Sequence, residues 1–291
     1  MLQRFTLPDG GILTWREYGD PAGTPVFFFH GWPGESHQGA LIHEAAQEMG
    51  VRLISPNRPG IGGSSRQPGR NLLDWPPMVT ALADHLKIDR FRVLGLSGGG
   101  PYALACAWAL GRHRVPACAT VCGALPAAPG PDRRRLSPIY QLMLGTHDHA
   151  PWLLQGALIP LVRVARIPPP RPLMRLGLLA LGPGDRAALL EKDAFRLYFP
   201  GFQNAMRSGM RGLWDDGHPY ASRWPFDPAA ITVPLVVWHG TQDRNFDCKG
   251  AARLAATVPG AQYHEVEEGH YSILRNRARP ILDSLLVLGK S

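Results

Sequence analysis

The sequence contains little cysteine. Four of its 291 residues are cysteines, and they form neither a Cys-x-x-Cys pair nor a zinc-binding spacing: Cys106, Cys118, Cys122 and Cys248. Most of them lie in alanine-rich apolar stretches, where a free thiol behaves as a small buried apolar group. This pattern predicts free thiols and excludes a zinc finger and a CxxC redox site.

Long apolar runs are also missing. The longest candidates, Trp152–Val162 and Leu176–Leu181, are shorter than the roughly 18 residues that cross a bilayer. The N-terminal residues Met1–Asp9 lack the charged-then-apolar layout of a signal peptide. We therefore expect a cytoplasmic protein without a membrane span.

Lysine is scarce, although the chain is basic. There are 31 basic and 23 acidic residues, which gives a net charge of +8, but only four of the basic residues are lysines. Many arginines fall between Arg112 and Arg175, where they alternate with prolines. No nucleic-acid recognition motif accompanies this charge, so it favours a solvated basic face and no nucleic-acid partner. We expect a monomer or a homodimer.

The apolar pattern alternates between strands and helices outside one central region. With 45% hydrophobic and 19% charged residues, the composition is that of a globular protein. We expect strands at Leu2–Leu7, Ile12–Tyr18, Val26–Phe29, Val51–Ser55, Phe91–Leu96, Ala117–Cys122, Val233–Trp238 and Gln262–Val266. Helices are expected at His37–Met49, Trp75–Leu86, Tyr102–Leu110, Cys248–Thr257 and Tyr271–Leu288. This alternation predicts an α/β protein with a parallel sheet.

The central region, residues 124–226, has no good strand candidate and many prolines. Its short helical stretches are Leu136–Leu144, Trp152–Val164, Leu173–Leu181 and Gly184–Phe199. The sequence therefore predicts an α/β core made of residues 1–123 and 227–291, with residues 124–226 as a helical insertion.

The most informative motif surrounds Ser97. Here Gly95-Leu96-Ser97-Gly98-Gly99 follows a buried strand and precedes a helix, which is the context of a serine exposed on a tight strand-to-helix turn. The positions two before and two after the serine must be small, and both are glycine. The motif predicts a nucleophilic serine.

A serine nucleophile needs a base and an acid that orients the base. Both should follow Ser97 in loops after later strands. Asp243 follows Val233–Trp238 and is the predicted acid; its rival Asp247 directly precedes a helix, which an N-cap role explains. His270 stands between the last core strand and the last helix, and is the predicted base.

An oxyanion formed at Ser97 would need two backbone N–H donors. The first should be the amide of Gly98, directly after the nucleophile. The second should come from the loop after the first buried strand, His30-Gly31-Trp32-Pro33-Gly34. Trp32 is the expected donor, because Pro33 has no N–H.

Together these motifs resemble the α/β-hydrolase fold superfamily, in its serine-hydrolase branch of esterase- and proline-iminopeptidase-like enzymes. The resemblance is carried by residues 30–34, Gly60-Ile61-Gly62-Gly63-Ser64, the Ser97 turn, His239-Gly240-Thr241-Gln242-Asp243 and Gly269-His270. It implies a mostly parallel eight-stranded sheet, with the helical insertion as a lid over the site. It implies no metal and no organic cofactor.

The sequence departs from the family in one loop. Pro56-Asn57-Arg58-Pro59 has Asn57 where the family usually has Asp, which puts a loop contact in doubt and leaves the chemistry intact. The motif around Gly31 and Pro33 also resembles epoxide hydrolases and dehalogenases. Those enzymes use an Asp nucleophile at the turn, and Ser97 argues against both.

The resemblance implies a serine hydrolase acting on a small-molecule carboxylic ester, thioester or lactone. Proline-iminopeptidase-like, perhydrolase- or haloperoxidase-like and C–C bond hydrolase activities use the same triad, and a ligand receptor on this fold is a non-enzymatic alternative. An iminopeptidase would need lid carboxylates for a substrate amine, and the arginine-rich lid disfavours a cation.

Aromatic residues are the candidates for contacting the substrate. The expected ones are Trp32, Tyr140, Trp152, Phe199 and Trp214. Those in the insertion could line an apolar pocket or instead join the lid to the core. His147-Asp148-His149 is interpreted as a polar lid loop and not as a metal site.

Overall fold

A single eight-stranded sheet forms the centre of the molecule in the computed structural model, which describes residues 1–126, 133, 136–167, 176, 178–179, 181–190 and 192–289. The strand order is β1-β2-β4-β3-β5-β6-β7-β8. The strands are β1 (Gln3–Thr6), β2 (Ile12–Gly19), β3 (Thr24–Phe29), β4 (Val51–Pro56), β5 (Arg92–Leu96), β6 (Cys118–Val121), β7 (Leu235–Gly240) and β8 (Gln262–Val266). Only β1–β2 and β2–β4 pair antiparallel; the other neighbours are parallel. This is the mostly parallel sheet that the sequence predicted.

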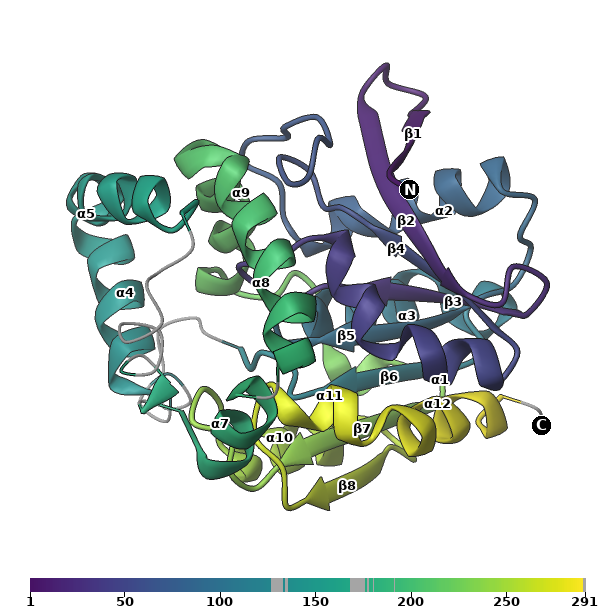
Figure 1. Cartoon of the computed structure of the whole chain (residues 1–291). Coiled ribbons are helices and arrows are strands. Elements are labelled where there is room, and N and C mark those ends of the chain that lie inside the picture. Colours follow the sequence, from purple (N-terminus) through teal and green to yellow (C-terminus); the bar gives the residue numbers. More distant parts are fainter. Residues whose placement is uncertain are drawn as a thin grey trace.

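Helices cover both faces of the sheet (Figure 1). One face packs against α2 (Trp75–His85), α3 (Gly100–Arg114) and α10 (Cys248–Thr257). The other packs against α1 (His43–Glu48), α11 (Ser272–Asn276) and α12 (Ala278–Val287). Short 3-10 helices precede or follow several of these elements: η1 (Ser36–Ile42), η2 (Leu72–Asp74), η3 (Ser97–Gly99) and η5 (Pro228–Ala230).

The apolar run of β3 shows why the sheet is buried on both faces. Phe27 and Phe29 pack in the core on the α3 side, while Val26 and Phe28 pack in the core on the α12 side. Successive side chains of a strand point to opposite faces, so a strand covered on both sides needs a continuous apolar run. The strand expected at Val26–Phe29 is therefore confirmed as part of β3.

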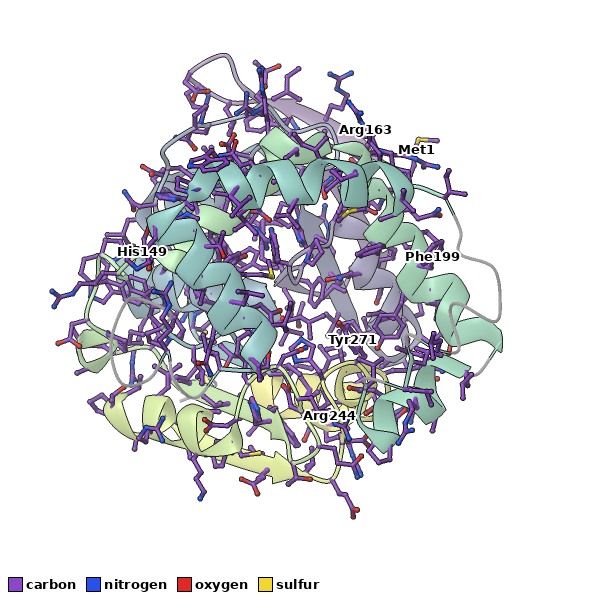
Figure 2. The ribbon with its side chains drawn as sticks, turned by 90° about the vertical axis from the view of Figure 1, so that its left-hand side faces the viewer. Met1, His149, Arg163, Phe199, Arg244 and Tyr271 are labelled. Carbon is purple, nitrogen blue, oxygen red and sulfur yellow. The ribbon has the colours of Figure 1, made fainter. Side chains whose placement is uncertain are left out.

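Residues 124–226, which make up most of the chain between β6 and β7, are called the β6–β7 segment from here on. Its helices are α4 (Pro138–His149), α5 (Pro151–Val164), α7 (Pro183–Leu190), α8 (Lys192–Arg207) and α9 (Gly209–Ala221). They gather at one end of the molecule (Figure 1); Figure 2 looks onto that end, with His149 and Arg163 marking the ends of α4 and α5. As predicted, its described residues contain no strand.

Several helix boundaries differ from the prediction. The helix expected at Gly184–Phe199 is two helices, α7 and α8, and α9 was not predicted. The helix expected at Tyr271–Leu288 is also two, because Arg277 leaves helical geometry (φ −116°) between α11 and α12. The helix expected at Leu173–Leu181 lies mostly outside the described residues.

The carboxyl ends of the parallel strands meet at one edge of the sheet. Ser97 follows β5, while Asp243 and His270 follow β7 and β8. Carboxyl ends are where ligands bind in open parallel sheets, so the topology brings the predicted site residues together. None of the helices in the described residues is long and apolar enough to cross a membrane.

Candidate active site

Ser97 occupies a turn that leaves no space for larger neighbours. Its φ is +50°, in the left-handed region that non-glycine residues seldom adopt. A Cβ atom added to Gly95 would lie 2.4 Å from the carbonyl oxygen of Gly99, and one added to Gly99 would lie 2.0 Å from the oxygen of Phe29. The sequence motif is therefore explained by the packing of β5, α3 and β3 around the turn.

Ser97, His270 and Asp243 form a continuous chain of hydrogen bonds. His270 Nε2 lies 2.9 Å from Ser97 Oγ, and His270 Nδ1 lies 2.8 Å from Asp243 Oδ2. All three side chains are buried or nearly so. In this geometry Nδ1–H donates to the carboxylate, which leaves Nε2 free to accept the proton of the serine hydroxyl.

The Asp243 carboxylate is fixed from both sides. Oδ1 accepts from the backbone N–H of Asn245 at 2.7 Å and of Phe246 at 3.2 Å, which leaves Oδ2 directed at His270. Asp247, the rival candidate, instead accepts from Gly250 N–H as the N-cap of α10. The structure thus brings Asp243, and not Asp247, to the histidine.

The electrostatics of the pair favour its charged form. Burial opposes the charge on Asp243, but the imidazole of His270 and its hydrogen bond outweigh burial and lower the pKa of Asp243. Burial likewise disfavours protonated His270, yet the charges of Asp243 and Asp185 raise the pKa of His270 above its usual value. An imidazolium that forms when Nε2 takes a proton is therefore stabilised.

The two residues predicted to supply the oxyanion donors, Trp32 and Gly98, lie close together beside Ser97. A Cβ atom added to Gly98 would lie 3.0 Å from the backbone nitrogen of Trp32. The Trp32 N–H donates to no acceptor in the described part of the chain. Arg58 holds the loop in place, since its guanidinium donates to the carbonyl oxygens of His30 and Gly31. The Trp32 and Gly98 amides are therefore close enough together to remain the candidates for binding one developing negative charge.

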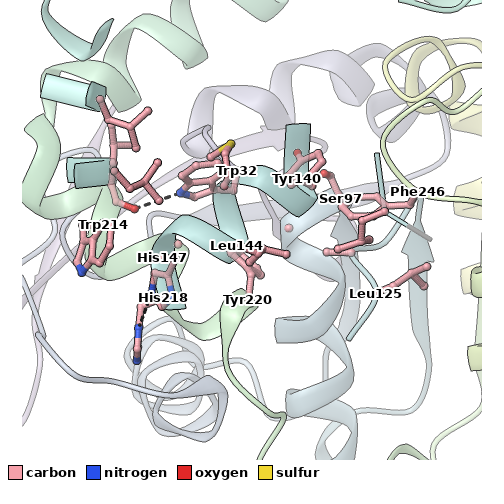
Figure 3. Close-up of a pocket in the computed structure, with 18 of the residues that line it drawn as sticks. Trp32, Ser97, Leu125, Tyr140, Leu144, His147, Trp214, His218, Tyr220 and Phe246 are labelled. Carbon is pink, nitrogen blue, oxygen red and sulfur yellow. Dashed lines mark hydrogen bonds between the residues drawn. The ribbon is translucent and has the colours of Figure 1, made fainter. Parts of the chain in front are cut away.

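An apolar pocket opens in front of Ser97 (Figure 3). Its cavity volume is about 90 Å³, several times the roughly 10–15 Å³ that one water needs. Three of the residues expected to contact the substrate line it, namely Trp32, Tyr140 and Trp214, together with Gly98, Leu125 and further residues of α4, α5 and α9. The pocket therefore joins the loops of the core to the β6–β7 segment.

Two of the predicted substrate contacts do not line this pocket. Leu154 and Leu158 are one helical turn apart on α5 and face the cavity; Trp152 is two residues before Leu154, which turns it by about 200° around the helix. Trp152 is accordingly 74% exposed. Phe199 stacks on Phe202, with ring centroids 6.3 Å apart, on α8.

Sequence reasoning missed the polar groups that the β6–β7 segment contributes. His147 belongs to α4 and not to a loop; its Nε2 lies 3.3 Å from Nδ1 of His218, and its ring stacks on Trp214 at 5.0 Å. The hydroxyl of Tyr220 is buried without a partner among the described residues. No local motif marks these residues, since their meeting depends on how α4 and α9 pack.

Asn57 keeps the contacts of its loop. Its Oδ1 accepts from the backbone N–H of Ser36 at 2.6 Å, and its Nδ2 donates to Thr14 Oγ1 at 2.8 Å. An amide can both donate and accept, so Asn57 satisfies both neighbours. The departure from Asp at this position leaves the loop hydrogen-bonded.

One cluster in the described residues has the composition of a metal site. Cys122, His239 and Asp243 place possible ligand atoms within 4.8 Å of one another. However, Asp243 Oδ2 is bonded to His270, and His239 Nε2 is 3.0 Å from the carbonyl oxygen of Phe246. Burial raises the pKa of the Cys122 thiol well above its usual value, whereas a metal ligand must be a thiolate. These three residues are therefore better explained as hydrogen-bonding neighbours in the environment of Asp243 than as ligands of a cation.

Comparisons with known proteins agree on the fold. A family model described as the α/β-hydrolase fold matches residues 24–148. The uncharacterized hydrolase YcgS of Bacillus subtilis is 33% identical over 99 residues, which cover 34% of this chain and 34% of that protein. In the curated relatives that the chain matches, the aligned part spans about a third of the relative's length or less.

Solved structures resemble the chain over its whole length. The enol-lactonase of Burkholderia xenovorans has a TM-score of 0.71 and 19% identity, with 99% of this chain and 100% of that one covered. The esterase RhEst1 of a Rhodococcus species has a TM-score of 0.71 and 18% identity, with 99% and 98% covered. At such identities the likeness concerns the fold.

Proposed function

We propose that this chain, of which residues 24–148 match the family model of the α/β-hydrolase fold, is a serine hydrolase that cleaves a carboxylic ester, thioester or lactone. The observation that carries the proposal is the hydrogen-bonded chain from Ser97 through His270 to Asp243. A serine hydroxyl is a weak nucleophile near neutral pH and needs this combination of base and orienting acid.

The proposed reaction proceeds through an acyl-enzyme. Ser97 Oγ attacks the carbonyl carbon while His270 Nε2 takes its proton, and the carbonyl oxygen becomes an oxyanion bound by the N–H groups of Trp32 and Gly98. As the intermediate collapses, His270 returns the proton to the departing alcohol or thiol. Water, deprotonated by His270, then attacks the acyl carbon and releases the acid and free Ser97. Asp243 keeps Nδ1 protonated throughout.

The pocket supports an ester over a peptide with a free amino terminus. Its described lining contains no Asp or Glu that could hold an ammonium group, and it is mainly aromatic and aliphatic. Burial of an unpaired cation there would be costly. In this proposal residues 124–226 form the lid, because α4, α5 and α9 supply most of the lining, and the substrate presents a small or moderately sized apolar group.

The proposal is tested by removing the nucleophile. Ser97→Ala should lower kcat/KM for p-nitrophenyl esters by about 10⁴-fold or more and abolish labelling by a fluorophosphonate probe. Ser65→Ala, at an exposed serine remote from the pocket, is the matched control and should do neither. Unchanged turnover by the Ser97→Ala protein would contradict the assignment. Vinylogous diketones and peracid formation, assayed alongside the esters, distinguish the other chemistries of this triad.

A further inference from the structure

A buried carboxylate from the β6–β7 segment holds the loop of His270. Asp185, in the first turn of α7, is only 2% exposed. Its two oxygens accept hydrogen bonds from three successive backbone N–H groups, those of His270 at 2.9 Å, Tyr271 at 2.8 Å and Ser272 at 2.9 Å. Asp185 therefore fixes the backbone at the histidine itself and caps the start of α11, a helix to which it does not belong.

The same turn of α7 also contacts the loop that carries Asp243. The backbone N–H of Gly184 donates to Gln242 Oε1 at 2.8 Å. The fit at Asp185 is close, because a Cβ atom added to Gly269 would lie between 2.1 and 2.5 Å from its carboxylate atoms. One helical turn thus touches the loops of both His270 and Asp243, and a change in its position would reach both.

Within the described residues, the charge of Asp185 is not neutralised by an ion pair. No Lys or Arg in the described part of the chain forms a salt bridge with it. A buried carboxylate is tolerated where several N–H groups satisfy its oxygens, and here three do. The negative charge therefore remains available to act on the adjacent imidazole of His270.

We propose that Asp185 is a positioning residue for His270: it holds the histidine backbone in register with Ser97 and adds a second negative charge that stabilises the imidazolium formed during acyl transfer. This inference rests on the proposed function, because it assigns the imidazole the role of the base. Among the described residues, three charged or titratable groups contact His270: Asp243 at its Nδ1, Asp185 at its backbone N–H, and the neighbouring phenol ring of Tyr271.

The direction of the pH effect follows from the sign of this charge. His270 must be neutral to accept the serine proton, so the acid limb of kcat/KM follows the pKa of His270. Burial lowers that pKa, while Asp243 and then Asp185 raise it. Removing the charge of Asp185 makes the imidazolium less stable and therefore moves the acid limb to lower pH.

The test is the variant Asp185→Asn, assayed as pH profiles of kcat and kcat/KM on a p-nitrophenyl ester. We expect kcat to fall by about 10- to 100-fold, KM to change little, and the acid limb to shift down by about half a pH unit to one unit. Asp185→Glu restores the charge and should return the acid limb toward its wild-type position. Asp247→Asn, at an N-cap of α10 that does not face His270, is the matched control and should leave the limb in place.

The outcomes separate this inference from the proposed function. A folded Asp185→Asn protein with lower kcat but an unmoved acid limb would show that Asp185 only caps α11, and would overturn the proposal. If Asp185→Asn does not fold, Asp185→Ser keeps a capping acceptor without the charge and takes its place. If wild-type protein hydrolyses none of the esters, the proposed function fails by itself. The shift is then measured on the C–H resonances of His270 by NMR titration.

Discussion

Two aspartates of the β6–β7 segment reach into the α/β core, and the core receives them differently. Asp216 on α9 is fully buried and is bound by Arg58, at 2.7 and 2.8 Å, and by Arg70, at 2.5 Å. Among the described residues, Asp185 on α7 is bound only by neutral backbone N–H groups. Both residues are buried aspartates of the β6–β7 segment. The difference between their effects must therefore come from the groups that bind them.

The Asp216 cluster supports the loop that carries Trp32. Burial opposes the charge of Asp216, but Arg58 and then Arg70 outweigh it and lower the pKa of Asp216. Arg58 in turn donates to the carbonyl oxygens of His30 and Gly31. The negative charge of Asp216 is therefore compensated by Arg58 and Arg70. The negative charge of Asp185, by contrast, raises the pKa of His270. We conclude that the Asp216 contact maintains the conformation of the Trp32 loop, and we expect the Asp185 contact to adjust the pKa of His270.

The largest effect should come from Asp216→Ala. Removing one partner of a buried ion pair leaves the other charge uncompensated and costs about 3–5 kcal/mol. We therefore expect the free energy of unfolding, measured by urea denaturation, to fall by about that amount. In the protein that still folds, the acid limb of the pH profile of kcat/KM should lie at the same pH as in the wild type. A loss below about 1 kcal/mol would show that the cluster is not desolvated as the structure indicates.

Two glycine variants should have an intermediate effect on the free energy of unfolding. They also distinguish the contact of Asp185 from that of Asp216. Gly269→Ala would press against the Asp185 carboxylate, and Gly212→Ala would place its Cβ 2.2 Å from the carbonyl oxygen of Gly60, on the Asp216 side. Each should destabilise the protein by about 1–3 kcal/mol, as overpacking does.

Their activities should differ. Gly269→Ala displaces the carboxylate from His270, so its acid limb should move to lower pH, while Gly212→Ala should leave the limb unchanged. Equal pH profiles for the two variants would remove the distinction between the two aspartates. Thermal denaturation and pH-rate profiles on the same preparations provide both readings.

Much of the fold and of the site could be predicted from the sequence because the signals are local. Ser97 lies in a turn whose glycines leave no room for a Cβ, and Val26–Phe29 is apolar throughout because both its faces are covered. Asp243 and His270 could be located because they follow strands of a sheet whose carboxyl ends converge. These are properties of short stretches and of strand order.

The two aspartates could not be found in this way. Asp185 lies 85 residues from its partner His270, and Asp216 lies 158 residues from Arg58. Neither carries a motif, and the helix that holds Asp216 was not predicted, because Gly217 and Pro219 interrupt its apolar pattern. The exposed position of Trp152 could not be predicted for a related reason: a helix apolar on several faces does not reveal which face meets the core.

The smallest effect should come from Arg66→Ala, at a third ion pair between the same two regions. Arg66 binds Asp215, the neighbour of Asp216, at 2.7 Å, but its side chain is 42% exposed. Water and salt weaken such a pair, so we expect a loss of less than about 1 kcal/mol that disappears at about 1 M salt. The loss caused by Asp216→Ala should persist at that salt concentration, because its partners are shielded from solvent. If salt changed the stability loss of both variants equally, burial would not distinguish the Asp216 contact from the Arg66 contact. The number of charges between the β6–β7 segment and the core would then matter more than their exposure to solvent.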